Sequence, residues 1–116
     1  MSVRKHIENF VEVYNRPASA VYPLYADTLD WIEMPSGRHG GRDELFAALK
    51  GVRDAITDMK LRVISIVANE HDGLLESEWT GKMVADGSPI KARVLWIFSF
   101  KDGKISKEHD YSCPAG

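Results

Sequence analysis

Two acidic residues lie two positions apart near the end of the chain, in Glu108-His109-Asp110-Tyr111. Side chains alternate along a β-strand, so in a strand Glu108 and Asp110 point to the same face. A carboxyl group in a partly apolar cavity, close to other carboxyls, has a raised pKa and can act as a general acid or base near neutral pH. On a solvent-exposed face the same residues need no functional explanation. The chemistry therefore depends on which face of the sheet is covered.

No other reactive group is expected to join this pair. In a regular strand His109 points to the opposite face, so it does not form a dyad with Asp110. The four histidines are scattered through the chain without the spacing of metal ligands. Cys113 has no histidine placed to activate it. We therefore expect neither a metal site nor a cofactor.

The elements that must position the carboxyls begin, in chain order, with two helices, a strand and a third helix. Apolar residues recur at helical spacing in the first and third helices, and Ser2 can cap the first. Pro23 kinks or splits the second helix. The expected elements are a helix over 3–14, a short helix over about 18–26, a strand over 28–34, a glycine-rich loop over 36–41 and a helix over about 42–56.

After residue 58 the apolar pattern changes from helical spacing to alternation, which predicts strands. Asp-Gly pairs at 86–87 and 102–103 are typical of tight hairpin turns. The four expected strands cover about 59–69, 74–84, 89–100 and 105–111. The sequence therefore predicts a single α+β domain over 1–116, with three N-terminal helices on one face of a curved sheet that ends in a four-stranded antiparallel meander.

If both Asp-Gly turns are two-residue loops, the register of the last three strands defines two faces. The aromatic face carries Leu75, Ser77, Trp79, Val94, Trp96, Phe98, Phe100, Ile105, His109 and Tyr111. The acidic face carries Glu76, Glu78, Thr80, Arg93, Leu95, Ile97, Ser99, Ser106, Glu108 and Asp110. Either face can lie under the helices, and a slip of one residue in either turn would exchange part of the assignment.

The chain resembles the nuclear transport factor 2-like superfamily, and most closely its branch of SnoaL-like polyketide cyclases and ketosteroid-isomerase-like proteins. The order of elements carries the likeness, together with four motifs. These are Leu24-Tyr25-Ala26-Asp27, the stretch from Trp31 to Pro35, Gly40-Gly41-Arg42-Asp43-Glu44-Leu45, and the ending from Phe98 to Ile105 followed by Glu108-His109-Asp110-Tyr111. The resemblance implies a cone-shaped fold with an apolar pocket between the sheet and the helices. It also implies a dimer, because members of this superfamily commonly dimerise through the outer face of the sheet.

The resemblance further implies that the acidic face lines the pocket. The expected ligand-binding residues are Phe10, Trp31, Glu78, Arg93, Leu95, Ile97 and Glu108. The aromatic face then becomes a homodimer interface formed by Trp79, Trp96, Phe98, His109 and Tyr111, because such a patch is a liability on a monomer.

The candidate catalytic residues also come from the resemblance. Asp110 resembles the carboxylate that serves as acid/base on the last strand of the family. A second family carboxylate precedes a proline at the end of the first strand, where this chain offers Glu33 or Met34, depending on which motif anchors the count. Tyr14 can supply a hydroxyl. Phe10 and Leu95 replace the two oxyanion-binding residues of the isomerases, which argues against steroid-type enolisation.

Composition narrows the possible partners. Apolar residues make up 44% of the chain, and 15 basic against 17 acidic residues give a net charge of −2. This balance argues against nucleic acid and anionic membranes, and one cysteine excludes an internal disulfide. No apolar segment follows the charged first residues, so we expect no signal peptide and a cytoplasmic location.

Three functions remain open. The first is a small cofactor-independent enzyme, isomerase- or cyclase-like or a related lyase or hydrolase, that uses carboxylate acid/base chemistry on an apolar, polyketide-like or steroid-like molecule. The second is a non-catalytic small-molecule-binding or carrier domain of the same fold. The third is an interaction module with a vestigial pocket.

Overall fold

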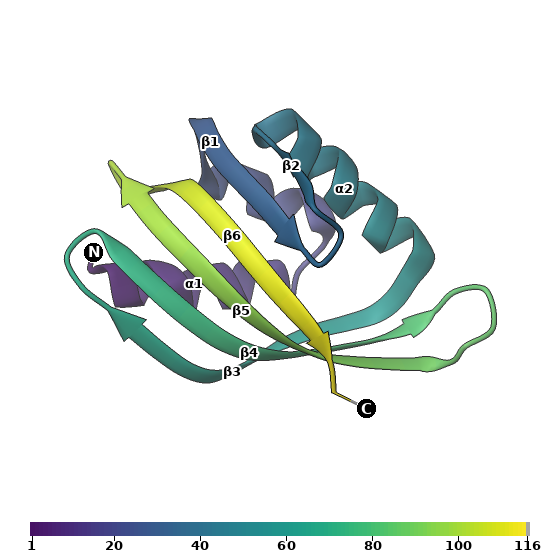
Figure 1. Cartoon of the computed structure of the whole chain (residues 1–116). Helices are drawn as coiled ribbons and strands as arrows, with labels where there is room; N and C mark the ends of the chain where they lie inside the picture. The colour runs from purple at the N-terminus through teal and green to yellow at the C-terminus, as the bar shows by residue number, and fades with distance from the viewer. Residues whose placement is uncertain (116) are drawn as a thin grey trace.

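Six strands form one curved mixed sheet in the computed structural model, which describes residues 1–115 (Figure 1). The strands are β1 (Tyr25–Met34), β2 (Arg38–Gly40), β3 (Ile56–Ala68), β4 (Asp72–Met83), β5 (Pro89–Lys101) and β6 (Lys104–Pro114). Their order across the sheet is β2-β1-β6-β5-β4-β3, with β1 parallel to β6 and every other pair antiparallel. The last four strands are the predicted meander, and the sheet continues from β6 to β1.

Two α-helices lie on the same side of the sheet, α1 (Val3–Tyr14) against β3 and β4, and α2 (Arg42–Ala55) against β1, β2 and β3 (Figure 1). The Ser2 side chain caps α1 by accepting a hydrogen bond from the Lys5 backbone N–H at 3.2 Å. Asn15 follows α1 and exchanges two hydrogen bonds with the backbone of Leu61 in β3, at 3.0 and 2.7 Å. This pair of contacts fixes the end of α1 on the sheet. No helix within residues 1–115 is long and apolar enough to cross a membrane.

The predicted α+β class is confirmed, with two local differences. The second predicted helix is a short 3₁₀ helix, η1 (Ala18–Leu24), and β1 begins directly after it at Tyr25. The glycine-rich loop contains β2, which pairs with the end of β1. Both differences add strand residues to the part of the sheet that lies beside α2.

The aromatic side chains of β4 and β5 face the helices. Phe10 of α1 packs against Trp96 and Phe98, with ring centroids 5.4 and 5.0 Å apart, and Trp96 and Phe98 are 6% and 0% exposed. The prediction that Trp96 and Phe98 form part of a dimer interface is therefore wrong, because both side chains are buried within the chain. Trp79 faces the same way, and burial of these rings under α1 forms the core of the domain.

The faces differ from prediction because of one bulge in β6. The β4–β5 register is shifted by two residues, with Ser77 opposite Val94, and a shift of two leaves the faces unchanged. In the β5–β6 pair, Phe100 lies opposite Ile105 but Ser99 lies opposite Lys107, so Ser106 is an extra residue. Every later residue of β6 thus changes face, and Glu108 and Asp110 join Trp96 on the inner face.

The acidic face as predicted is therefore divided. Glu108 and Asp110 lie inside, as expected, but four predicted pocket residues lie on the outer face of β4 and β5: Glu78, Arg93, Leu95 and Ile97. Their assignment to the pocket is wrong because the bulge brings only residues of β6 to the inner face. The residues of β4 and β5 that were predicted to share a face with Glu108 and Asp110 stay on the outer face. His109 and Tyr111 lie on the outer face, as predicted.

Candidate functional site

A cavity of about 340 Å³ lies between the inner face of the sheet and α2. Its wall is mostly apolar, and most of its polar groups come from β1, β2, β6 and the end of α1. The lining residues are Tyr14, Tyr25, Trp31, Glu33, Arg38, Leu45, Ala48, Leu49, Val52, Ile56, Trp79, Ile90, Ala92, Val94, Trp96, Glu108, Asp110 and Ser112. Such a cavity, apolar with a few convergent polar groups, is the usual form of a small-molecule site.

Glu108 is the most deeply buried acidic residue of the cavity, with 1% of its surface exposed. The Tyr25 hydroxyl donates a hydrogen bond to its Oε1 at 2.5 Å. Desolvation, followed by the neighbouring charge of Asp110, raises the pKa of Glu108 to about 8, although the bond from Tyr25 opposes this rise. At neutral pH this carboxyl therefore retains its proton.

Asp110 lies two residues farther along the same face and is 8% exposed. Burial and then the charge of Glu33 raise the pKa of Asp110 to about 7, while Trp31 and Arg38 lower it. The Trp31 indole N–H is directed toward this carboxyl and lowers its pKa as a weak donor, although the contact falls short of full hydrogen-bond geometry. A carboxyl that both holds and releases its proton near neutral pH meets the first requirement of a general acid or base.

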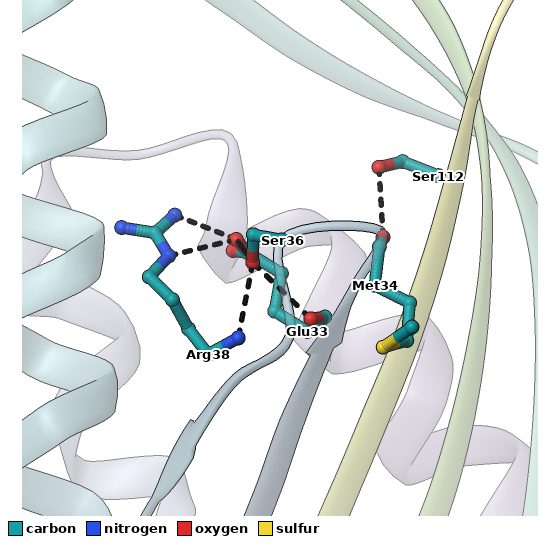
Figure 2. Close-up of polar contacts among 5 residues, drawn as sticks. All are labelled: Glu33, Met34, Ser36, Arg38 and Ser112. Atoms are coloured by element: carbon teal, nitrogen blue, oxygen red, sulfur yellow. Dashed lines mark hydrogen bonds and ion pairs between the residues drawn. The ribbon is translucent and has the colours of Figure 1, made fainter.

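Glu33 lies at the cavity wall and is held by its neighbours in the β1–β2 turn (Figure 2). Its Oε1 accepts hydrogen bonds from Arg38 Nη2 at 2.6 Å, from Arg38 Nε at 2.9 Å and from Ser36 Oγ at 2.8 Å. Met34 points away from the cavity and is 38% exposed, and its carbonyl accepts a bond from Ser112. Of the two predicted alternatives, the structure therefore brings Glu33, and not Met34, to the cavity.

Tyr14, at the end of α1, brings a neutral hydroxyl to the cavity. Trp79 Nε1 donates to this hydroxyl at 3.2 Å, and the Arg53 guanidinium lies 5.1 Å from the ring centroid and donates to the Tyr14 carbonyl. Burial raises the pKa of Tyr14 to about 12, although Trp79 and Arg53 oppose the shift. Tyr14 therefore keeps its proton and acts as a hydrogen-bond donor or acceptor.

Five residues predicted to bind a ligand lie elsewhere. Phe10 is 1% exposed and belongs to the aromatic core under α1. On the outer face, Glu78 forms ion pairs with Arg62 and Lys91, and Arg93 pairs with Glu76, all at 3.4 Å. Leu95 is 39% exposed, and Ile97 lies on the same outer side. None of these side chains lines the cavity.

Sequence reasoning missed the contributions of Tyr25, Arg38 and the apolar side of α2. Tyr25 belongs to a motif that indicated the family, and Leu45 and Leu49 were recognised only as a helical stripe. No local signal marks the role of Tyr25, because its bond to Glu108 depends on β1 lying beside β6. Within residues 1–115, no three acidic, histidine or cysteine side chains are grouped so that they could hold a metal ion.

Comparisons with solved structures agree with the fold described above. A protein of Catenulispora acidiphila with a ketosteroid isomerase-like fold, solved in complex with trimethylamine, superposes with a TM-score of 0.83 at 12% identity, over 96% of this chain and 86% of that one. A proposed polyketide cyclase of Xanthomonas campestris pv. campestris gives 0.83 at 19% identity, over 93% and 87%. AclR, a proposed hydroxylase of Streptomyces galilaeus, gives 0.83 at 18% identity, over 94% and 77%. At these identities the likeness shows the fold alone.

Sequence comparison identifies the family. No curated protein sequence matches the chain. The sequence model of the SnoaL-like domain matches residues 4–108, which is nearly the whole chain. The chain therefore belongs to the SnoaL-like domain family, with the nuclear transport factor 2-like fold that the resemblance implied.

Proposed function

We propose that this protein is a cofactor-independent enzyme that transfers protons to and from an apolar small molecule in the cavity. The observation that carries the proposal is the pair Glu108 and Asp110, two buried carboxyls with raised pKa values on the wall of an apolar cavity. Ionised carboxylates are expensive to bury, so such a pair is more typical of a reactive site than of a structural core.

Asp110 is the acid/base in this proposal. Its pKa of about 7 provides both protonation states near neutral pH, and it is less deeply buried than Glu108. Glu108 retains its proton and, held by Tyr25, keeps a polar but uncharged neighbour beside Asp110. Tyr14 supplies a neutral hydroxyl to the ligand. Glu33 affects Asp110 through its charge, because Arg38 and Ser36 already occupy its Oε1.

The experiment measures exchange of α-protons for deuterium in two apolar, enolisable ketones, 2-tetralone and 2-decalone. Proton NMR in D₂O follows the exchange with wild-type protein, with Asp110→Asn and with the control Asp86→Asn, which lies in the β4–β5 turn and bonds Ser88. We expect the Asp110 variant to lose about 100-fold in rate, as is typical when a general base is removed. The Asp86 variant keeps the wild-type rate.

Two outcomes contradict the proposal. Exchange that persists in Asp110→Asn removes Asp110 from the mechanism. Binding of both ketones without exchange in the wild-type protein favours a non-catalytic ligand-binding or carrier domain, because the same apolar cavity serves that role without proton transfer.

We also propose that two copies of the chain associate through the outer face of the sheet. Met34, Tyr111 and Leu95 lie side by side across β1, β6 and β5, and they are 38%, 41% and 39% exposed. Leu74 and Ile97 form a neighbouring pair across β4 and β5. An exposed apolar row on a sheet is typical of an interaction surface.

Sedimentation velocity across a range of concentrations tests the association. We expect a dimer for the wild-type protein and a monomer for Leu95→Lys, since a lysine in the centre of the row places a charge in the interface. Val84→Lys, at an exposed position in the β4–β5 turn away from this row, is the matched control and should stay dimeric. A wild-type monomer at all concentrations would contradict the proposal.

A further inference from the structure

One polar group on the cavity wall, the Trp31 indole N–H, completes no hydrogen bond within residues 1–115. The chain has three tryptophans, and the indole N–H groups of two of them are occupied. Trp79 Nε1 donates to the Tyr14 hydroxyl at 3.2 Å, and Trp96 Nε1 donates to Ser77 Oγ at 2.9 Å. Trp31 is 2% exposed, and its Nε1 has no hydrogen-bond acceptor within residues 1–115. A buried donor without an acceptor is rare and requires an explanation.

The position of Trp31 connects this donor with the candidate site. Trp31 lies in β1 opposite Glu108 of β6 and lines the cavity. It also lines a more open hollow between the β1–β2 turn and α2, which includes Ser36, Arg38 and His39. Its N–H is directed toward Asp110 and lowers the pKa of that carboxyl as a weak donor, but the contact falls short of full hydrogen-bond geometry. The unpartnered donor is therefore beside the proposed acid/base, where the inner cavity meets its mouth.

We infer that the ligand of this cavity carries an acceptor oxygen, such as a ketone or ester carbonyl, on an otherwise apolar body, and that the Trp31 indole N–H binds this oxygen. The inference rests on the proposed function only in taking the cavity as the ligand site. Trp31 is then a specificity-determining residue, and it places the ligand oxygen beside Asp110.

The selectivity follows from the cost of an unmade hydrogen bond. A ligand with an acceptor completes the bond of the buried N–H, whereas a hydrocarbon of the same shape leaves the donor buried and unsatisfied. Polar groups placed in an apolar pocket discriminate in this way between ligands that differ by a single acceptor. The preference should be about fivefold for one neutral hydrogen bond of average net strength.

Two rigid probes of nearly equal shape test the inference, 2-adamantanone and 2-methyleneadamantane. They differ by a carbonyl oxygen in place of a methylene group. The ketone cannot enolise, because its α-carbons are bridgeheads, so binding is measured apart from any proton-transfer activity. In wild-type protein labelled with ¹⁵N-tryptophan, we expect the ketone to shift the Trp31 indole signal downfield. The alkene should leave it near its starting position, and the signals of Trp79 and Trp96 should move little.

Substitution gives the second measurement. Trp31→Phe removes the N–H and keeps an aromatic ring, and Trp96→Phe is the matched control because its N–H is bonded to Ser77 inside the protein. The ratio of the dissociation constants of alkene and ketone should fall about fivefold in the Trp31 variant. It should stay at the wild-type value in the Trp96 variant. Circular dichroism checks that each variant folds. If a variant folds poorly, the NMR comparison in the wild-type protein still tests the inference without any substitution.

Three results would overturn the inference. Equal shifts of the Trp31 signal with both probes show that the oxygen does not bind there. An unchanged ratio of the two dissociation constants in Trp31→Phe shows that the indole N–H does not contribute to the preference for the ketone. Failure of both probes to bind removes the cavity as a site for apolar ligands of this size. If the first or second result occurs while Asp110-dependent exchange of 2-tetralone persists, the proposed function stands and only the role of Trp31 is wrong.

Discussion

The buried carboxyls predict that the protein becomes less stable as the pH rises. In an unfolded chain an aspartate has a pKa near 3.9, whereas the pKa of Asp110 in the folded protein is about 7. Between these values the folded state binds a proton that the unfolded state has lost. Stability therefore falls with increasing pH across this window, is unaffected by Asp110 below it, and levels off above it.

The size of the effect follows from the shift. A rise from 3.8 to about 7 corresponds to about 4 kcal/mol when Asp110 is fully ionised. The open cavity lets water reach the ionised carboxylate, so we expect about 2–4 kcal/mol. A chain of 116 residues typically has about 6–17 kcal/mol of stability in total. The titration of this one carboxyl thus removes a large share of the total stability between about pH 4 and pH 7.

Urea denaturation followed by tryptophan fluorescence, at pH 5, 7 and 8.5, measures this dependence. Asp110→Asn keeps a neutral side chain of the same shape, so its stability should exceed that of the wild type by about 1–2 kcal/mol at pH 5, where part of the window is already crossed, and by about 2–4 kcal/mol at pH 8.5. Asp86→Asn is the control, because Ser88 lowers the pKa of Asp86 and places its titration below the window. Equal pH slopes for Asp110→Asn and the wild type would refute the reasoning, as would a wild-type stability that rises with pH.

Three further substitutions test individual contacts. Tyr25→Phe removes the hydrogen bond to Glu108, so the pKa of that carboxyl should rise further in a ¹³C NMR titration and the protein should lose about 1 kcal/mol of stability; an unchanged pKa would contradict the role of the bond. Arg38→Gln removes a positive charge that lowers the pKa of Asp110, so NMR should show this pKa rising, and a fall would be inconsistent with the geometry. Asn15→Ala removes two hydrogen bonds between the end of α1 and β3, and thermal or urea unfolding should show a loss of about 2 kcal/mol, whereas a change within experimental error would mean that these bonds do not stabilise the fold.

The sequence was sufficient to predict most of the elements because their signals are local. The Asp-Gly pair at 102–103 does form a tight turn, with positive φ at Asp102 and Gly103, and the strands on either side alternate as expected. The bulge at Ser106 has no comparable local signal, because it depends on how β6 must bend to pair with β5 and β1 together. The assignment of faces therefore succeeded for Glu108 and Asp110 and failed for Leu95.

The candidate site shows the same division. The polar residues of the cavity come from segments far apart in the sequence, and alternation within β1 and β6 is enough to place Glu33 and Asp110 inward. The bond between Tyr25 and Glu108 spans 83 positions, and it forms because β1 lies parallel to β6. Parallel pairing of these strands has no turn that marks it in the sequence. For this reason Tyr25 and Arg38 were visible only in the structure.

The bulge has a further consequence for the energetics of the fold. It moves two carboxyls from a solvent-exposed face, where they would cost little, to the inner face beside Trp31 and Trp96. Burial there raises both pKa values, so the native state opposes ionisation of its own side chains. An apolar residue at position 108 or 110 would fill the same space without this penalty. A feature that opposes folding and lies on the wall of an open cavity is most simply explained by chemistry at that wall, since local conflicts with stability are expected at functional sites.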